Sequence, residues 1–260
     1  MRIAVNGSDT FVGTGGKRFD PALPAIIFLH GAGMDHSVWA LLARSFAHHG
    51  YGVLAPDLPG HDRSAGVPLS SIAALADWTA ALIDAAGLSG ARIVGHSMGS
   101  LVALETAARH PDKITALGLI ATAAPMRVSD DLLNAARTND RAAIDMISIW
   151  GEGYSATLGG SLAPGLWMLG GAERLLERAR PGVIFADLAA CNAYQDTLAA
   201  AAKVGVPSIV IQGSRDVMTP AKGGKAVANA IPGCRLAMIE GAGHMLMSER
   251  PDEVLAALRS

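Results

Sequence analysis

The sequence contains little cysteine. Its 260 residues include two cysteines, Cys191 and Cys234, which share no spacing typical of metal ligands. A chain of this length can bury a core large enough to fold without disulfide staples. We therefore expect two free, buried thiols and no metal site.

Charge and long hydrophobic runs are also scarce. Only 17% of the residues are charged and the formal net charge is −2, which argues against a nucleic-acid or anionic-membrane partner. No apolar run approaches the roughly 20 residues of a membrane span, and residues 1–16 lack the features of a secretory signal. We expect a soluble, cytoplasmic protein with a small, largely uncharged partner molecule. Its oligomeric state, monomer or homodimer, stays open.

Short apolar runs alternate with amphipathic segments along most of the chain. The runs are AIIFLH (25–30), GVLAP (52–56), ARIVGH (91–96), ALGLIATA (116–123), PSIVIQG (207–213) and RLAMIEG (235–241). Such runs are typical of parallel strands covered on both faces, and the first two segments between them have helical spacing that stops at Gly50 and Gly87. This order predicts an α/β fold with a mostly parallel, doubly wound sheet.

The alternation breaks between Pro125 and Lys203. Helix-like pieces follow one another there without a strand, at 130–137, 142–150, 172–179 and 183–194. Ligands of such sheets bind at the carboxyl ends of the strands, so an all-helical insertion between two strands is well placed to cover that site. We predict one domain, with a core at 1–125 and 204–260 and a helical cap at 126–203.

The segment RIVGHSMGSLVAL (92–104) joins an apolar run to a run of helix formers. Its serine, Ser97, lies at the corner between Gly95 and Gly99. A sharp strand-to-helix turn strains the serine backbone and brings neighbouring chain so close that glycine is needed on either side. The turn lifts the hydroxyl above the sheet, beside free N–H groups of the helix, so we predict that Ser97 is a nucleophile.

A serine hydroxyl needs a base to remove its proton and an acid to orient that base. Asp216 and His244 are the candidates, because each follows a predicted strand. The order Ser97, Asp216, His244 is that of nucleophile-elbow hydrolases. Thr219 and Pro220 then predict the N-cap and first residue of the next helix.

Acyl transfer also needs fixed hydrogen-bond donors for the negative charge of its transition state. One candidate is the backbone N–H of Met98, directly after the serine. The other is expected in the glycine-rich loop HGAG (30–33), where we favour the N–H of Ala32, with Gly33 as the alternative.

Together these segments resemble the α/β-hydrolase superfamily. LHGAG, APDLPGHDRS, GHSMGS, GSRDVMTP and GAGHMLMSERP match its recurring segments in order, over most of 23–125 and 205–258. Asp62 departs from the pattern, which usually has glycine after the histidine. Ser97 separates the chain from the dehalogenases and epoxide hydrolases of the family, which have aspartate at the elbow. The resemblance implies a serine-nucleophile, esterase-like enzyme with an α/β-hydrolase fold.

Methionines and tryptophans near these loops and in the predicted cap suggest a pliable apolar pocket. The candidate lining residues are Gly33, Met34, His36, Met126, Met146, Trp150, Trp167, Met168, Met218 and Met245. Packing within the cap is the competing explanation for those that lie there.

The remaining histidines are expected to have no catalytic role. His30 and His96 adjoin the oxyanion loop and the elbow, and we interpret them as structural hydrogen-bonding residues. Surface or loop positions are expected for His36, His48, His49, His61 and His110.

We predict a cofactor-free serine hydrolase that forms an acyl-enzyme with carboxylic esters carrying a small to medium hydrophobic group. The same triad also serves C–C bond hydrolysis, lactone hydrolysis, perhydrolysis and lyase reactions, and only the cap and pocket would decide between them. A ligand-binding receptor that keeps the framework with little turnover is the alternative from a different class.

Overall fold

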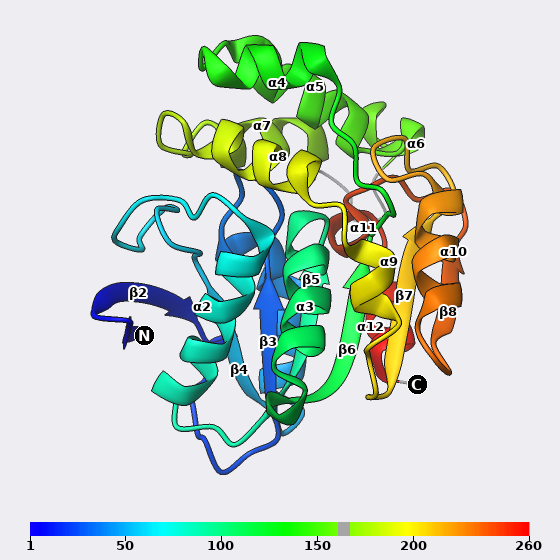
Figure 1. Ribbon diagram of the computed structural model, residues 1–260. Coiled ribbons are helices and arrows are strands. Elements are labelled where there is room, and N and C mark those ends of the chain that lie inside the picture. Colours follow the sequence, from blue (N-terminus) through cyan, green and yellow to red (C-terminus); the bar gives the residue numbers. More distant parts are fainter. Residues whose placement is uncertain (161–166, 260) are drawn as a thin grey trace.

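The computed structural model describes residues 1–160 and 167–259, which form a mostly parallel sheet of eight strands flanked by helices (Figure 1). The strands are β1 (Arg2–Val5), β2 (Ser8–Gly13), β3 (Ala25–Leu29), β4 (Gly52–Pro56), β5 (Ala91–His96), β6 (Ile114–Ile120), β7 (Ser208–Gly213) and β8 (Arg235–Ile239), in the order β1-β2-β4-β3-β5-β6-β7-β8. β3 to β8 are parallel to one another, whereas β2 pairs antiparallel with β4. The predicted fold class and six strands are confirmed, although β6 lies slightly earlier than the run 116–123.

An antiparallel hairpin, β1 and β2, extends the sheet at one edge, and sequence reasoning missed it. Its turn is Asn6–Gly7, where both residues have positive φ, 49° and 78°. Asn-Gly is the preferred pair for the two-residue turns of β-hairpins. The signal was therefore present in the sequence.

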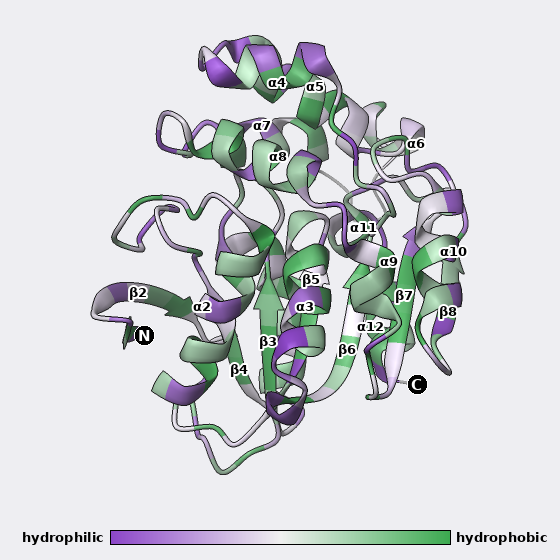
Figure 2. Cartoon of the chain, in the orientation of Figure 1, coloured by the Kyte–Doolittle hydropathy of each residue, from purple (hydrophilic) through white to green (hydrophobic). Residues whose placement is uncertain are grey.

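Helices cover both faces of the sheet. α2 (Ile72–Ala85), α3 (Met98–Arg109), α9 (Thr197–Ala201) and α10 (Ala221–Ala230) cover one face, and α1 (Ala40–Ala47) and α12 (Pro251–Arg259) cover the other (Figure 1). Apolar residues predominate along β3 and β7, as expected for strands covered on both sides (Figure 2). α3 packs on β5 and β6, which places the turn that precedes it above the centre of the sheet.

A helical segment between β6 and β7 lies beyond the carboxyl ends of the strands, at the top of Figure 1. It contains α4 (Asp130–Arg137), α5 (Arg141–Gly151), α6 (Tyr154–Thr157), α7 (Met168–Leu176) and α8 (Val183–Ala193). α9 follows in the chain but packs against α3 and α10, in the helical layer of the sheet.

The structure also bears on the cysteines and on membrane insertion. Both cysteines are free, but only Cys191 is buried, because Cys234 is half-buried. Within residues 1–160 and 167–259, the structure has no helix with the length and apolar character to cross a membrane.

Candidate active site

Ser97 occupies the tight turn between β5 and α3. Its backbone has φ 52° and ψ −118°, a conformation that residues other than glycine rarely adopt. A Cβ on Gly95 would lie 2.0 Å from the carbonyl oxygen of Gly99, and a Cβ on Gly99 would lie 2.2 Å from that of Leu29. Both flanking glycines are therefore steric requirements of this turn.

Asp216 and His244 contact each other in the loops that follow β7 and β8. His244 Nδ1 and Asp216 Oδ2 are 2.9 Å apart, and both residues are buried. Asp216 Oδ1 accepts the N–H groups of Met218 and Thr219 at 2.9 and 2.8 Å. A carboxylate carries no proton, so Nδ1 donates and Nε2 is left as the basic nitrogen of the neutral ring.

These contacts favour the ionised form of Asp216. Burial alone would raise the pKa of this carboxyl group. The neighbouring His244 and the hydrogen bonds from His244 and Thr219 outweigh burial, and they hold the pKa of Asp216 below its usual range. Asp216 is thus a fixed negative charge that selects one tautomer of His244 and stabilises its protonated form.

Thr219 belongs to this network, and sequence reasoning missed its role. Its Oγ1 donates to Asp216 Oδ2 at 2.6 Å and lies 3.1 Å from His244 Nδ1. The predicted N-cap role of Thr219 is wrong, because α10 begins at Ala221, after Pro220 as the cap residue. A threonine three residues after an aspartate is well placed for a local side-chain bond, so a signal did exist.

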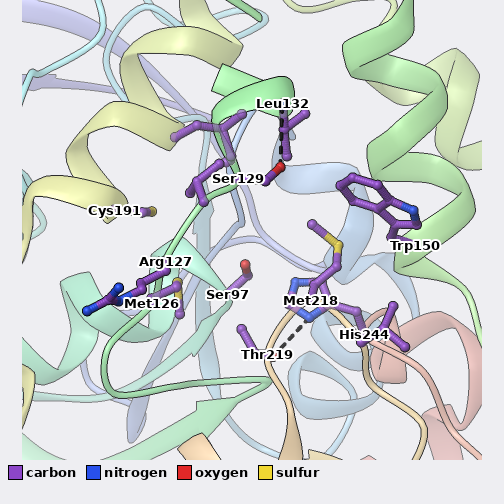
Figure 3. A pocket seen from close by; sticks show the side chains of 14 residues that line it. Ser97, Met126, Arg127, Ser129, Leu132, Trp150, Cys191, Met218, Thr219 and His244 are labelled. Carbon is purple, nitrogen blue, oxygen red and sulfur yellow. Dashed lines mark hydrogen bonds between the residues drawn. The ribbon is translucent and has the colours of Figure 1, made fainter. Parts of the chain in front are cut away.

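Ser97 and His244 line one cavity of about 340 Å³ (Figure 3). Residues 126–129, Leu132, Trp150 of α5 and Leu188 of α8 form walls on the side of the helical segment. No hydrogen bond joins Ser97 Oγ to His244 among the described residues. Both side chains nevertheless open onto the same, largely apolar space.

The candidate oxyanion donors differ in availability. Met98 begins α3, and neither its N–H nor that of Ala32, which lines the cavity, has an acceptor in the described part of the chain. The N–H of Gly33 is engaged, because it donates to Asp187 Oδ2 at 2.8 Å. The geometry therefore favours Ala32 over Gly33.

His30 and His96 are buried and hydrogen-bond to the backbone. His30 Nδ1 donates to the Gly31 carbonyl at 2.9 Å, and its Nε2 accepts the N–H of Leu58 at 3.1 Å. His96 Nε2 donates to the carbonyl of His244 at 3.0 Å. Burial, the main cause, lowers the pKa of His30 to about 4 and that of His96 to about 3. Both rings are neutral at neutral pH and act as structural hydrogen-bonding residues.

His61 is buried, which corrects the expectation of a surface or loop position. Its Nε2 lies 2.8 Å from Asp187 Oδ2 and its Nδ1 lies 3.0 Å from the Pro59 carbonyl oxygen. Both partners accept hydrogen bonds, an arrangement that favours the doubly protonated, positively charged ring. Burial lowers the pKa of a histidine, but the charge of Asp187 outweighs it and raises the pKa of His61.

The candidate pocket residues divide among three places. Met126, Trp150 and Met218 line the cavity of Ser97. A second cavity of about 240 Å³ is lined by Trp167, Met168 and Met245. The remaining candidates, Gly33, Met34, His36 and Met146, line neither cavity. Sequence reasoning missed Leu132 and Leu188, because a leucine on a helix gives no sign of which partner it faces.

Asp35, His36, Asp57 and Asp62 are the described residues that could hold a metal ion, with ligand atoms within 4.8 Å of one another. Asp57 Oδ1 already accepts the N–H and Nδ1 of His36, at 2.8 and 2.7 Å, and Asp35 forms an ion pair with Arg178. The bonds of Asp57 join the short helix His36–Trp39 to the loop after β4, and the ion pair of Asp35 reaches the segment between α7 and α8. We interpret the cluster as structural.

Glu152 and Glu249 form a buried acidic pair beside the loop that carries His244. Both carboxylate oxygens of Glu249, in α11 (Leu246–Glu249), lie 3.0 Å from the amide nitrogen of Gly243. Glu152 Oε2 has no partner among the described residues. Burial and the charge of Glu249 raise the pKa of Glu152 to about 8, and burial also raises the pKa of Glu249.

We expect Glu152→Gln to stabilise the protein at pH 8 and to change its stability little at pH 5. A carboxyl group with a higher pKa in the folded than in the unfolded chain binds more protons when folded. The free energy of unfolding therefore falls as pH rises from 4.5 to about 8. The amide of Glu152→Gln cannot ionise, so the variant keeps this part of the free energy of unfolding. We expect a gain of about 1 to 3 kcal/mol at pH 8, seen as a higher Tm in calorimetry. Glu240→Gln, at an exposed position, is the control, and an equal gain at pH 5 would contradict the assignment.

A serine held on a strand-to-helix turn above a parallel sheet, sharing a cavity with an Asp-bonded histidine, defines a hydrolase of the α/β type. The chain belongs to the alpha/beta hydrolase family, whose model matches residues 26–257. The esterase-like resemblance read from the sequence is confirmed.

Individual relatives agree with this assignment. The chain is 31% identical over 246 residues to pimeloyl-acyl carrier protein methyl ester esterase of Chromobacterium violaceum, covering 90% of this chain and 92% of that protein. An enzyme of the same name from Neisseria meningitidis is 33% identical over 241 residues, covering 88% of each. The crystal structure of the enol-lactonase from Burkholderia xenovorans LB400 matches with a TM-score of 0.87 and 25% identity, covering 100% of this chain and 98% of that one.

Proposed function

We propose that this protein hydrolyses carboxylic esters through an acyl-enzyme, with Ser97 as nucleophile, His244 as base and acid, and Asp216 as the orienting carboxylate. One observation carries the proposal: the strained Ser97 shares a cavity with His244, whose Nδ1 is bonded to the buried Asp216. The relatives named above, esterases and a lactonase, support ester chemistry.

The reaction follows from the roles of these groups. Ser97 Oγ attacks the ester carbonyl carbon while His244 Nε2 takes its proton, and the N–H groups of Ala32 and Met98 stabilise the oxyanion. The bond to the alcohol then breaks as His244 returns the proton to the leaving oxygen. A water molecule, deprotonated by His244, attacks the acyl-enzyme and releases the acid, which restores Ser97.

The cavity supports a substrate with a small to medium hydrophobic group. Its volume is about 340 Å³, and Met126, Leu132 and Leu188 give it apolar walls. We propose that α4 to α8, within the inserted segment 126–203, form a cap over a core made of 1–125 and 204–260. A small, largely uncharged ester as the partner and a cytoplasmic location remain our predictions.

Lactone hydrolysis is the second candidate. A lactone is a cyclic ester, so the same attack and proton transfers apply, and the acid and alcohol leave as one molecule. The fold similarity to the enol-lactonase, over the whole of both chains, favours this reaction among the alternatives.

Wild-type protein is expected to hydrolyse p-nitrophenyl esters with a kcat/KM that rises from acetate to a medium acyl chain and then falls. The cavity has room for a limited apolar group, and each well-placed methylene contributes about 1 to 3 kcal/mol to discrimination. Leu132→Ala should shift the preference to longer acyl chains because Leu132 lines the cavity. Leu133→Ala, at the neighbouring position outside the cavity, is the matched control. Absence of turnover with the esters and with simple lactones would overturn the proposal.

A further inference from the structure

Helix α8 contacts the loop that carries Ala32. Asp187 of α8 is 1% exposed, and its Oδ2 accepts the N–H of Gly33 at 2.8 Å. Gly33 has φ 68°, and a Cβ there would lie 2.7 Å from Ile184 Cγ1 of the same helix. The helix therefore packs directly on the peptide that follows Ala32.

The same oxygen of Asp187 binds His61. His61 Nε2 lies 2.8 Å from Asp187 Oδ2, and His61 is itself almost fully buried. A carboxylate is a stronger acceptor for a backbone N–H than a neutral amide. Three segments meet at Asp187: α8, the loop after β3 and the loop after β4.

The segment between α7 and α8 binds the same two loops. Arg178 forms an ion pair with Asp35 and donates to Ser37 Oγ at 3.2 Å. Arg180 donates to the carbonyl oxygens of Asp62 and Ser64, at 2.8 and 3.0 Å. The buried contact of Asp187 with Gly33 is thus one of several contacts that link residues 178–187 to the loops after β3 and β4.

We propose that Asp187 is a positioning residue for ester hydrolysis. Its bond to the Gly33 N–H holds that amide on α8 and leaves the preceding N–H, on Ala32, available to the cavity as an oxyanion donor. This inference rests on the proposed function, because Ala32 matters only where an oxyanion forms. Misplacing a catalytic group by about 1 Å can cost about 10²-fold in rate, so this contact affects the chemical step. The cap then controls the reaction rate as well as the choice of substrate.

The test compares kcat and KM of Asp187→Asn with wild type on the best p-nitrophenyl ester. We expect kcat to fall about 10- to 100-fold with little change in KM, because a misplaced oxyanion donor weakens binding of the transition state more than of the substrate. The rate of inactivation by a fluorophosphonate should fall in parallel. Asn139→Gly is the matched control, since Asn139 Oδ1 accepts the N–H of Gly182 at the start of α8, a bond to this helix that involves no residue of the oxyanion loop. This control should keep the wild-type kcat.

Asp187→Asn removes the counter-charge of the buried His61, which threatens folding. The double variant Asp187→Asn/His61→Gln replaces the ion pair with two amides and allows the same comparison. A folded variant of either kind with kcat within about twofold of wild type would overturn the proposal. So would an equal loss of kcat in Asn139→Gly. Failure of the wild type on every ester would instead contradict the proposed function.

Discussion

Replacing Ser97 with alanine is expected to lower kcat for p-nitrophenyl ester hydrolysis by about 10⁶, the scale of loss that follows removal of a catalytic serine. The substitution removes the atom that forms the acyl-enzyme and leaves His244, Asp216 and the oxyanion donors in place. Water that His244 activates can still hydrolyse some ester directly, and this reaction sets the lowest rate that the variant can show. Initial rates, with enzyme in excess where needed, measure the loss.

Folding and labelling distinguish a lost nucleophile from a damaged protein. Ser97→Ala should keep its secondary structure and Tm, because alanine removes one oxygen that faces the cavity and has no role in the turn. Ser208→Ala is the matched control, since it removes a buried hydroxyl at the start of β7, the end of the strand away from the site. Intact mass after fluorophosphonate treatment should show one adduct on wild type and on the control. Undiminished turnover by Ser97→Ala would reject the mechanism.

The core of the fold could be predicted because its signals are local. The apolar run 91–96 and the helix that follows it need no distant contact to be recognised, and the structure has them as β5 and α3. The hairpin of β1 and β2 is also local, but its strands are short and mix exposed with buried positions, so they form no continuous apolar run. Its turn at Asn6–Gly7 was the stronger signal.

The residues of the site also differ in whether local sequence could predict them. Ser97, Asp216 and His244 each follow an apolar run within three residues, so parallel strand order alone brings them to one edge of the sheet. Asp187 could not be predicted, since its partner Gly33 lies 154 residues earlier and the contact depends on how α8 packs. The division of pocket candidates between two cavities depends on helix packing for the same reason.

The second large effect is expected for Asp216→Asn, which should lower kcat by about 10⁴ while the protein stays folded. The amide can donate a hydrogen bond toward His244 Nδ1, and this favours the tautomer whose proton lies on Nε2, where the attacking hydroxyl needs a base. The amide also removes the charge that stabilises the imidazolium form. KM should change much less than kcat, because Asp216 does not line the cavity.

Another Asp–His pair, outside the cavity, offers a matched control for Asp216→Asn. Asp57 Oδ1 lies 2.7 Å from His36 Nδ1, and Asp57 is fully buried, but neither residue lines the cavity of Ser97. Asp57→Asn should therefore lower Tm and leave kcat within about tenfold of wild type, the cost of a disturbed structural pair. If Asp216→Asn lost no more activity than Asp57→Asn, a carboxylate other than Asp216 would have to orient His244. The large gap that we expect between the two variants follows from the bond of Asp216 to His244, which lines the same cavity as Ser97.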